Sequence, residues 1–197
     1  ITILFFIFIS QTWTTADEIT DFEIEGITVG NSLLDFFTKD QIENEKNSEF
    51  VYVYPDNKFM KIGIGSGKEF FLQKNIDNYD DLGVIIKPND MNYYIYGIQG
   101  RIFCDDGIDL CFSKKKIILS ELKEMFSDNA NLDNYENSHS VDKSGKSMTT
   151  SSEFRLKTGD LIIASCYGWT KKMEYWDNYR IILRSKEFEN WLRSAHR

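Results

Sequence analysis

The feature that most constrains the fold is a succession of short apolar runs, each followed by residues that favour a turn. The clearest turns are residues 55–57, 87–90 and 157–160, and each separates two runs rich in Val, Ile, Phe or Tyr. Such runs are typical of β-strands, and turns this short join antiparallel neighbours. We therefore predict an antiparallel sheet of about six to eight strands. The apolar runs cover residues 50–54, 58–64, 70–72, 84–86, 91–103, 149–156, 161–167 and 179–183.

Helical patterns are isolated among these strands. The clearest covers residues 109–126, where apolar side chains recur along one narrow stripe. A second helix is expected over residues 32–45, beginning at the N-cap Ser32, and a short third helix after Ser185. This arrangement favours an α+β fold with two or three helices packed mainly on one face of the sheet, and disfavours a parallel βαβ fold. The stripe consists of Cys111, Ile118, Leu122 and Met125.

The first residues have the pattern of an export signal. Residues 1–9 are apolar and uncharged, which suits a signal peptide and is far short of the roughly 20 residues that a membrane span needs. Thr14 and Ala16 fit a cleavage site, and acidic residues follow at once. We interpret residues 1–16 as a truncated signal peptide, the alternative being a buried N-terminal strand. The protein is then expected in the periplasm or secreted, with no membrane span in the mature chain.

The remaining residues 17–197 are expected to form one domain, because 197 residues suit a single core and no linker or repeat is visible. Residues 127–147 are polar and rich in Asn, Asp and Ser, which predicts a surface loop. The net charge is −8, with 31 acidic and 23 basic residues. Nucleic-acid binding is disfavoured, because it requires a basic face that neutralises phosphates.

Few residues suggest catalysis or metal binding. The chain has 2 histidines, His139 in the polar stretch and His196 beside the C-terminus, and we interpret both as exposed bystanders. No catalytic residue, cofactor or His-based metal site is therefore expected. Of two acidic clusters, the group of Asp105, Asp106 and Asp109 is the first candidate for Ca²⁺, since Gly107 lets that loop turn tightly. Solvated loop carboxylates are the alternative interpretation.

An aromatic segment near the C-terminus is the main candidate for a binding site. Trp169, Tyr175, Trp176 and Arg180 lie close together in the sequence, with further Tyr and Lys residues between them. Aromatic and basic side chains together can anchor a protein or a small molecule. The same residues could instead close one end of the core, and for the segment as a whole we favour that interpretation while keeping the binding surface as the alternative.

The chain has 3 cysteines, of which at most two can pair with each other. We favour a disulfide between Cys111 and Cys166. Cys111 lies on the inward stripe of the expected helix, and Cys166 shares its strand face with the small side chain of Ala164. A bond between Cys104 and Cys111 is the alternative, and the third option is that all three are small buried thiols.

Two motifs resemble those of a family of small exported proteins of uncharacterised function from Pelagibacter-like marine bacteria. Residues 24–35 match the opening of that family, and residues 166–180 match its ending, with Gly168 in place of Asp and Thr170 in place of Ser. The resemblance covers most of the chain. It implies export and a single domain, and it implies no activity and no catalytic residues.

Taken together, these patterns predict an exported soluble protein that acts as a periplasmic binding or interaction module. Its partner, a protein or a small molecule, is not specified by the sequence. The alternative is a hydrolase-like enzyme of the periplasm that works with carboxylates alone. We favour the non-enzymatic function, because histidines are scarce and no nucleophile motif is present.

Overall fold

The computed structural model describes residues 18–105, 107–126 and 128–195. The expected signal peptide at residues 1–16 lies outside the described residues. The described chain begins with a short 3-10 turn, η1 (Ile19–Asp21), which places Ile19 in the core.

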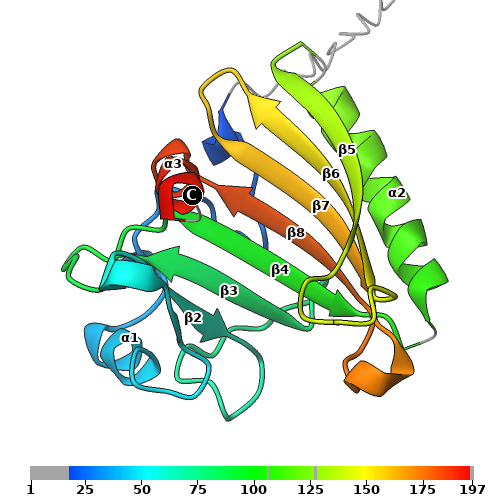
Figure 1. The fold of residues 1–197 in the computed structure, drawn as a ribbon. Helices are drawn as coiled ribbons and strands as arrows, with labels where there is room; N and C mark the ends of the chain where they lie inside the picture. The colour runs from blue at the N-terminus through cyan, green and yellow to red at the C-terminus, as the bar shows by residue number, and fades with distance from the viewer. Residues whose placement is uncertain (1–17, 106, 127, 196–197) are drawn as a thin grey trace, which may run out of the picture.

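The described residues form one antiparallel sheet of eight strands, in the order β1-β2-β3-β4-β8-β7-β6-β5 (Figure 1). The predicted α+β class and the size of the sheet are confirmed. Sequential hairpins account for most neighbours, and the exception is β8, which pairs with β4 and so joins the two halves of the sheet. The strands are β1 (Tyr52–Val53), β2 (Met60–Ile64), β3 (Asp81–Ile86), β4 (Gly97–Phe103), β5 (Ala130–Ser138), β6 (Met148–Leu156), β7 (Leu161–Gly168) and β8 (Asn178–Arg184).

The longest helix, α2 (Ile108–Met125), covers one face of the sheet over β7 and β8. Its buried Cys111 and Leu122 join the main core, which is built from alternate residues of the central strands. The helix α1 (Lys39–Glu45) contributes Ile42 to the same core. The fully buried Ile62, Val84 and Ile98 lie on this face of the sheet.

The C-terminal helix α3 (Lys186–Ala195) lies on the opposite face. Its Phe188 and Trp191 pack with Phe59 and Ile85 in a separate cluster. Ile85 follows Val84 directly in β3, so the two side chains point to opposite faces of the sheet. The helices are therefore divided between the two faces, with α1 and α2 contributing to the main core and α3 packing on the other side.

The helix predicted over residues 32–45 is divided in two. The 3-10 turn η2 (Leu33–Asp35) and α1 each begin at their own capping box, with Ser32 and Thr38 as N-caps. A continuous helix cannot pass through Thr38, because this N-cap residue has an extended backbone.

The polar stretch 127–147 is not a continuous loop, which corrects the sequence prediction. Its first part is β5, an edge strand that pairs along its whole length with β6. Most of its side chains are exposed, so it lacks the apolar alternation by which a half-buried strand is recognised. Charged and polar side chains on an edge strand discourage pairing with another molecule.

The disulfide also differs from the favoured pair. Cys104 is bonded to Cys111, with their Cα atoms 5.8 Å apart, and Cys166 is a buried free thiol. Gly107, at φ 97°, turns the chain from the end of β4 into α2 and so returns Cys111 to Cys104. The prediction of a Cys111–Cys166 disulfide was wrong. The turn brings Cys111 to Cys104, and a cysteine can form only one disulfide.

Peptide mapping without reduction should recover Cys104 and Cys111 in one linked species and Cys166 as a thiol. We expect Cys166 to react with an alkylating reagent only after unfolding. It lies under α2, and burial raises the pKa of its thiol to about 11, an effect that Lys115 partly opposes. Recovery of a peptide linking Cys166 to either other cysteine would contradict this assignment.

Candidate functional site

The candidate site lies on the face of the sheet opposite α2. In β4 and β8, alternate residues point to this face, and the register sets Arg101 beside Arg180 and Phe103 beside Asn178. Their neighbours Ile102 and Tyr179 point to the opposite, core face. Along β4 and β8, polar and aromatic side chains on this face therefore alternate with core side chains on the other face.

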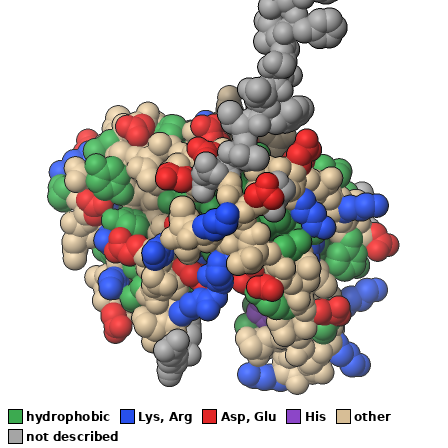
Figure 2. Space-filling model, turned by 90° about the horizontal axis from the view of Figure 1, so that it is seen from above, with side chains coloured by type: hydrophobic (Ala, Val, Ile, Leu, Met, Phe, Trp, Pro, Cys, Tyr) green, Lys and Arg blue, Asp and Glu red, His purple; other side chains and the backbone are tan. Residues whose placement is uncertain are grey.

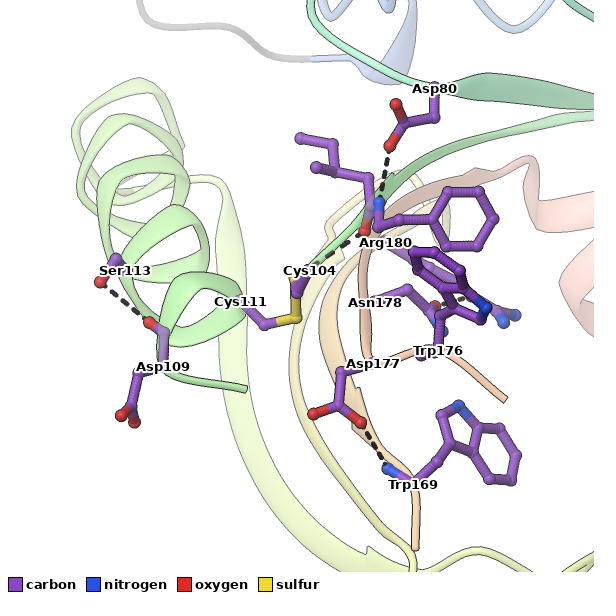
Figure 3. Close-up of a disulfide and its surroundings, with 12 residues drawn as sticks. Asp80, Cys104, Asp109, Cys111, Ser113, Trp169, Trp176, Asp177, Asn178 and Arg180 are labelled. Carbon is purple, nitrogen blue, oxygen red and sulfur yellow. Dashed lines mark hydrogen bonds between the residues drawn. A yellow bond between two sulfur atoms is a disulfide. The ribbon is translucent and has the colours of Figure 1, made fainter. Parts of the chain in front are cut away.

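The segment between β7 and β8 forms one wall of the site. Trp169 is half-buried and its ring contacts Tyr175 edge-on at 4.9 Å between centroids, while Trp176 faces Phe103 at 6.1 Å. The backbone N–H of Trp169 donates a hydrogen bond to Asp177 at 2.7 Å, which fixes the start of this segment to its end (Figure 3). Trp176 is 61% exposed, so the interpretation of this segment as core does not apply to it.

The segment between β5 and β6 forms the second wall. His139 contacts the ring of Trp169 at 4.3 Å between centroids. The carboxylate of Asp142 accepts hydrogen bonds from the backbone N–H and hydroxyl of Ser147 and from the hydroxyl of Thr170. Hydrogen bonds from Ser147, and after them those from Ser144, lower the pKa of Asp142. Asp142 therefore ties the two walls together.

These walls enclose a pocket of about 430 Å³, which we call the aromatic pocket. It brings together all four residues proposed from the sequence as a binding site. Figure 2 shows the molecule hollowed between two lobes, with Lys and Arg side chains gathered there and a histidine on one side. The residues proposed from the sequence are Trp169, Tyr175, Trp176 and Arg180.

Arg180 lies in this pocket without a carboxylate partner among the described residues. Its Nε donates a hydrogen bond to the amide oxygen of Asn178 at 2.7 Å, and its guanidinium stacks on Tyr167 at 4.2 Å. Burial lowers the pKa of Arg180, and the neighbouring Arg101 lowers it further, against an opposing effect of Tyr167. The direction of the shift means that the pocket disfavours this positive charge.

A second, smaller cavity of about 150 Å³ continues the site across β2 and β3, sharing Arg101 with the aromatic pocket. Arg101 forms an ion pair with Asp81 on the neighbouring strand. The Lys61 side chain packs against Gly83. A Cβ atom on residue 83 would come within 2.9 Å of the Lys61 Cδ, so glycine leaves room for this side chain. We call the combined surface the basic trough.

Lys61 likewise forms no ion pair with a carboxylate of the described chain. Burial lowers the pKa of its ammonium, and Arg180 and Arg101 lower it further, with Asp81 opposing. The described residues that line the trough therefore include three Lys or Arg side chains and two carboxylates, of which Asp81 is already paired with Arg101 and Glu174 is exposed. This imbalance favours binding of an anion.

The buried indole N–H of Trp169 adds an unused donor, because it has no acceptor among the described residues. An unpaired buried donor is costly, and a ligand oxygen placed beside it would remove that cost. The pocket therefore offers a ligand positive charge, and one of its lining residues holds a buried donor without an acceptor in the described chain.

The sequence analysis missed Lys61, Arg101 and His139. His139 is not a bystander but lies against Trp169, where burial and then Arg180 lower its pKa. The alternation of Arg101 and Phe103 in β4 was the one local signal of a polar sheet face. Nothing local indicated that Lys61 and His139 would meet it. His196 lies outside the described residues.

The acidic group proposed for Ca²⁺ is only partly described. Asp105 is exposed after β4, Asp109 is exposed in the first turn of α2, and Asp106 lies outside the described residues. Across the described chain, no three His, Cys, Asp or Glu side chains converge closely enough to hold a metal ion.

Comparison with protein-family models, with curated protein sequences and with solved structures found no match for this chain. Of the helices in the described part of the chain, none has the length and apolar character required to cross a membrane.

Proposed function

We propose that this protein is an exported binding protein for a small anionic ligand with a flat apolar ring, which it holds in the aromatic pocket. The observation that carries the proposal is the pair of half-buried cations, Arg180 and Lys61, that lack a carboxylate partner in the described chain. The Cys104–Cys111 disulfide supports export, because such bonds persist in oxidising compartments.

The ligand class follows from the groups that line the trough. A carboxylate or sulfonate on Arg180 would form a charge-assisted hydrogen bond and remove the repulsion between Arg180, Arg101 and Lys61. A flat ring attached to that anion would lie between Trp169 and Trp176, which stand beside Arg180 in Figure 3. The hollow shape favours a small molecule over a flat protein surface.

A carboxylate-dependent hydrolase is less well supported by this site. Two carboxylates with different protonation would have to face the bound substrate. Of the described residues lining the two cavities, Asp81 is paired with Arg101, and Glu174 stands exposed at the opening. These two are not a matched acid and base, so binding is the function that the geometry favours.

Titration of the protein with naphthalene-2-sulfonate, followed by tryptophan fluorescence, tests the proposal. We expect saturable quenching, and we expect Arg180→Gln to weaken binding by about tenfold or more, because a charge-assisted hydrogen bond contributes roughly 1.5–3 kcal/mol. Lys171→Gln is the matched control, since Lys171 is an exposed cation of the same segment that does not line the pocket.

The neutral naphthalene-2-sulfonamide separates charge recognition from simple apolar binding. We expect it to bind about tenfold more weakly than the sulfonate. Trp176→Ala should weaken both compounds with little change in thermal stability, because the side chain is 61% exposed. Equal binding of the two compounds, or an equal loss in Lys171→Gln and Arg180→Gln, would refute the proposed function.

A further inference from the structure

A third cavity, of about 550 Å³, lies on the opposite face of the sheet from the basic trough. It is enclosed by the segment around Phe22, by the loop around Tyr79, and by the outer part of α2. Ile102 and Tyr179, which alternate with Arg101 and Arg180 along β4 and β8, line its base. The two sites are therefore separated by the thickness of the sheet.

The charge of this cavity is opposite to that of the trough. Four carboxylates of the described chain surround its opening, against the single cation Lys114. Glu25 also accepts hydrogen bonds from the backbone N–H and the side-chain amide of Asn78, at 2.8 and 3.1 Å. The base is apolar, with Ile102 and Ile118, and the exposed Ile117 adds a further apolar side chain to the lining. The carboxylates are Glu23, Glu25, Asp77 and Glu121. We call this site the acidic cavity.

The hydroxyl of Tyr179 provides an independent indication of a ligand. The residue is 1% exposed, it lines the acidic cavity, and its hydroxyl has no hydrogen-bond partner among the described residues. Burial raises the pKa of this hydroxyl, and Tyr79, Cys166 and Glu121 raise it further. Because buried hydroxyls are almost always paired, this one lacks a partner that a ligand could supply.

We infer that the acidic cavity binds an organic ammonium ion with a short apolar chain. The ammonium group would lie near Glu121 and donate a hydrogen bond to the Tyr179 hydroxyl, while the chain would cover the isoleucine side chains of the base. The ring of Tyr79, packed over Gly100, adds an aromatic surface of the kind that attracts organic cations.

An organic cation fits the cavity better than a metal ion does. Among the described residues, no three carboxylates, histidines or cysteines come close enough together to act as ligands. A hard cation such as Ca²⁺ takes six to eight oxygen ligands, and an apolar base supplies none. A cation with an apolar chain uses both the acidic opening and the isoleucine base. This inference is independent of the proposed function, because the two sites share no lining residue.

Hexylammonium chloride is the probe, added to the ¹⁵N-labelled full chain at constant ionic strength and followed by amide chemical shifts. We expect saturable shifts at residues around the acidic cavity, and about fivefold weaker binding in Glu121→Gln and in Tyr179→Phe. Glu124→Gln is the matched control, since Glu124 is an exposed carboxylate of the same helix that does not line the cavity. Arg180→Gln should leave hexylammonium binding unchanged.

1-Hexanol, which has the same chain without the charge, decides between the inference and a purely apolar site. We expect it to bind at least about fivefold more weakly than hexylammonium. Equal binding of hexanol would overturn the inference, as would an equal loss of affinity in Glu124→Gln and Glu121→Gln. Unchanged affinity in Tyr179→Phe would also overturn it, because the free hydroxyl would then have no part in binding.

Discussion

Replacing Phe59 with alanine is expected to lower the free energy of unfolding by about 3–5 kcal/mol. The Phe59 side chain is fully buried where α3 packs on the sheet. Its ring lies 5.0 Å from Phe188, 5.1 Å from Trp191 and 5.4 Å from Tyr96, measured between centroids. Alanine would leave a cavity among three rings and remove their favourable edge contacts. Denaturant unfolding followed by circular dichroism measures the loss.

Phe112→Ala is the matched control for this substitution. Phe112 is 42% exposed on α2, so its truncation removes less buried area than truncation of the fully buried Phe59, and alanine favours the helix. We expect a change within about 0.5 kcal/mol. Similar losses in the two variants would mean that α3 does not pack on the sheet as described.

Replacing Glu189 with alanine is expected to cost about 3 kcal/mol. Glu189 is 4% exposed, and its carboxylate accepts hydrogen bonds from Arg193 at 2.6 Å and from Arg184 at 3.0 Å. A third arginine, Arg155, lies 3.8 Å away. Removing the carboxylate leaves three arginine side chains around an empty position, and their mutual repulsion adds to the lost hydrogen bonds. Denaturant unfolding again provides the measurement.

The same carboxylate gives the stability a defined dependence on pH. Burial alone would raise the pKa of Glu189, but the hydrogen bonds and charges of Arg193 and Arg184 outweigh burial and lower it below 4.5. A lowered pKa in the folded state contributes stability that is fully present above the pKa of the unfolded chain. That contribution is lost as the pH falls through the folded value. Glu189→Gln should therefore lose less stability than the wild type on acidification below about pH 4.

Glu187→Ala is the control on the same helix. Glu187 is exposed and pairs with Lys87 at 2.8 Å, and exposed ion pairs contribute about 0–1 kcal/mol. If Glu187→Ala cost as much stability as Glu189→Ala, the buried position of Glu189 would not be the cause of the expected effect.

The residues proposed from the sequence for binding lie in one short segment. Trp169, Tyr175, Trp176 and Arg180 belong to the connection between β7 and β8 and to β8 itself, so a local pattern was enough to group them. Lys61, Arg101 and His139 reach the same surface from β2, β4 and the end of β5. Their meeting depends on the strand order, which no local pattern specifies.

The disulfide was predicted between residues far apart in the sequence, whereas the bond joins two cysteines that are close in the sequence. Cys111 and Cys166 were expected to pair because each lies on an inward face, and the structure does place both in the core around α2. Facing the same core does not bring two sulfur atoms to bonding distance. The turn at Gly107 does so for Cys104 and Cys111, which are separated by only seven positions.

Local sequence patterns were enough to predict the α+β class, the large antiparallel sheet, the helix α2 and the turns before β2, β4 and β7. Turn chemistry and apolar periodicity are local, so they act wherever the segment lies. Tertiary structure decided three further features: the pairing of β4 with β8, the polar edge strand β5, and the face on which α3 packs. Each depends on which distant surfaces become buried together. Local residue patterns do not specify which strand or helix a segment will contact.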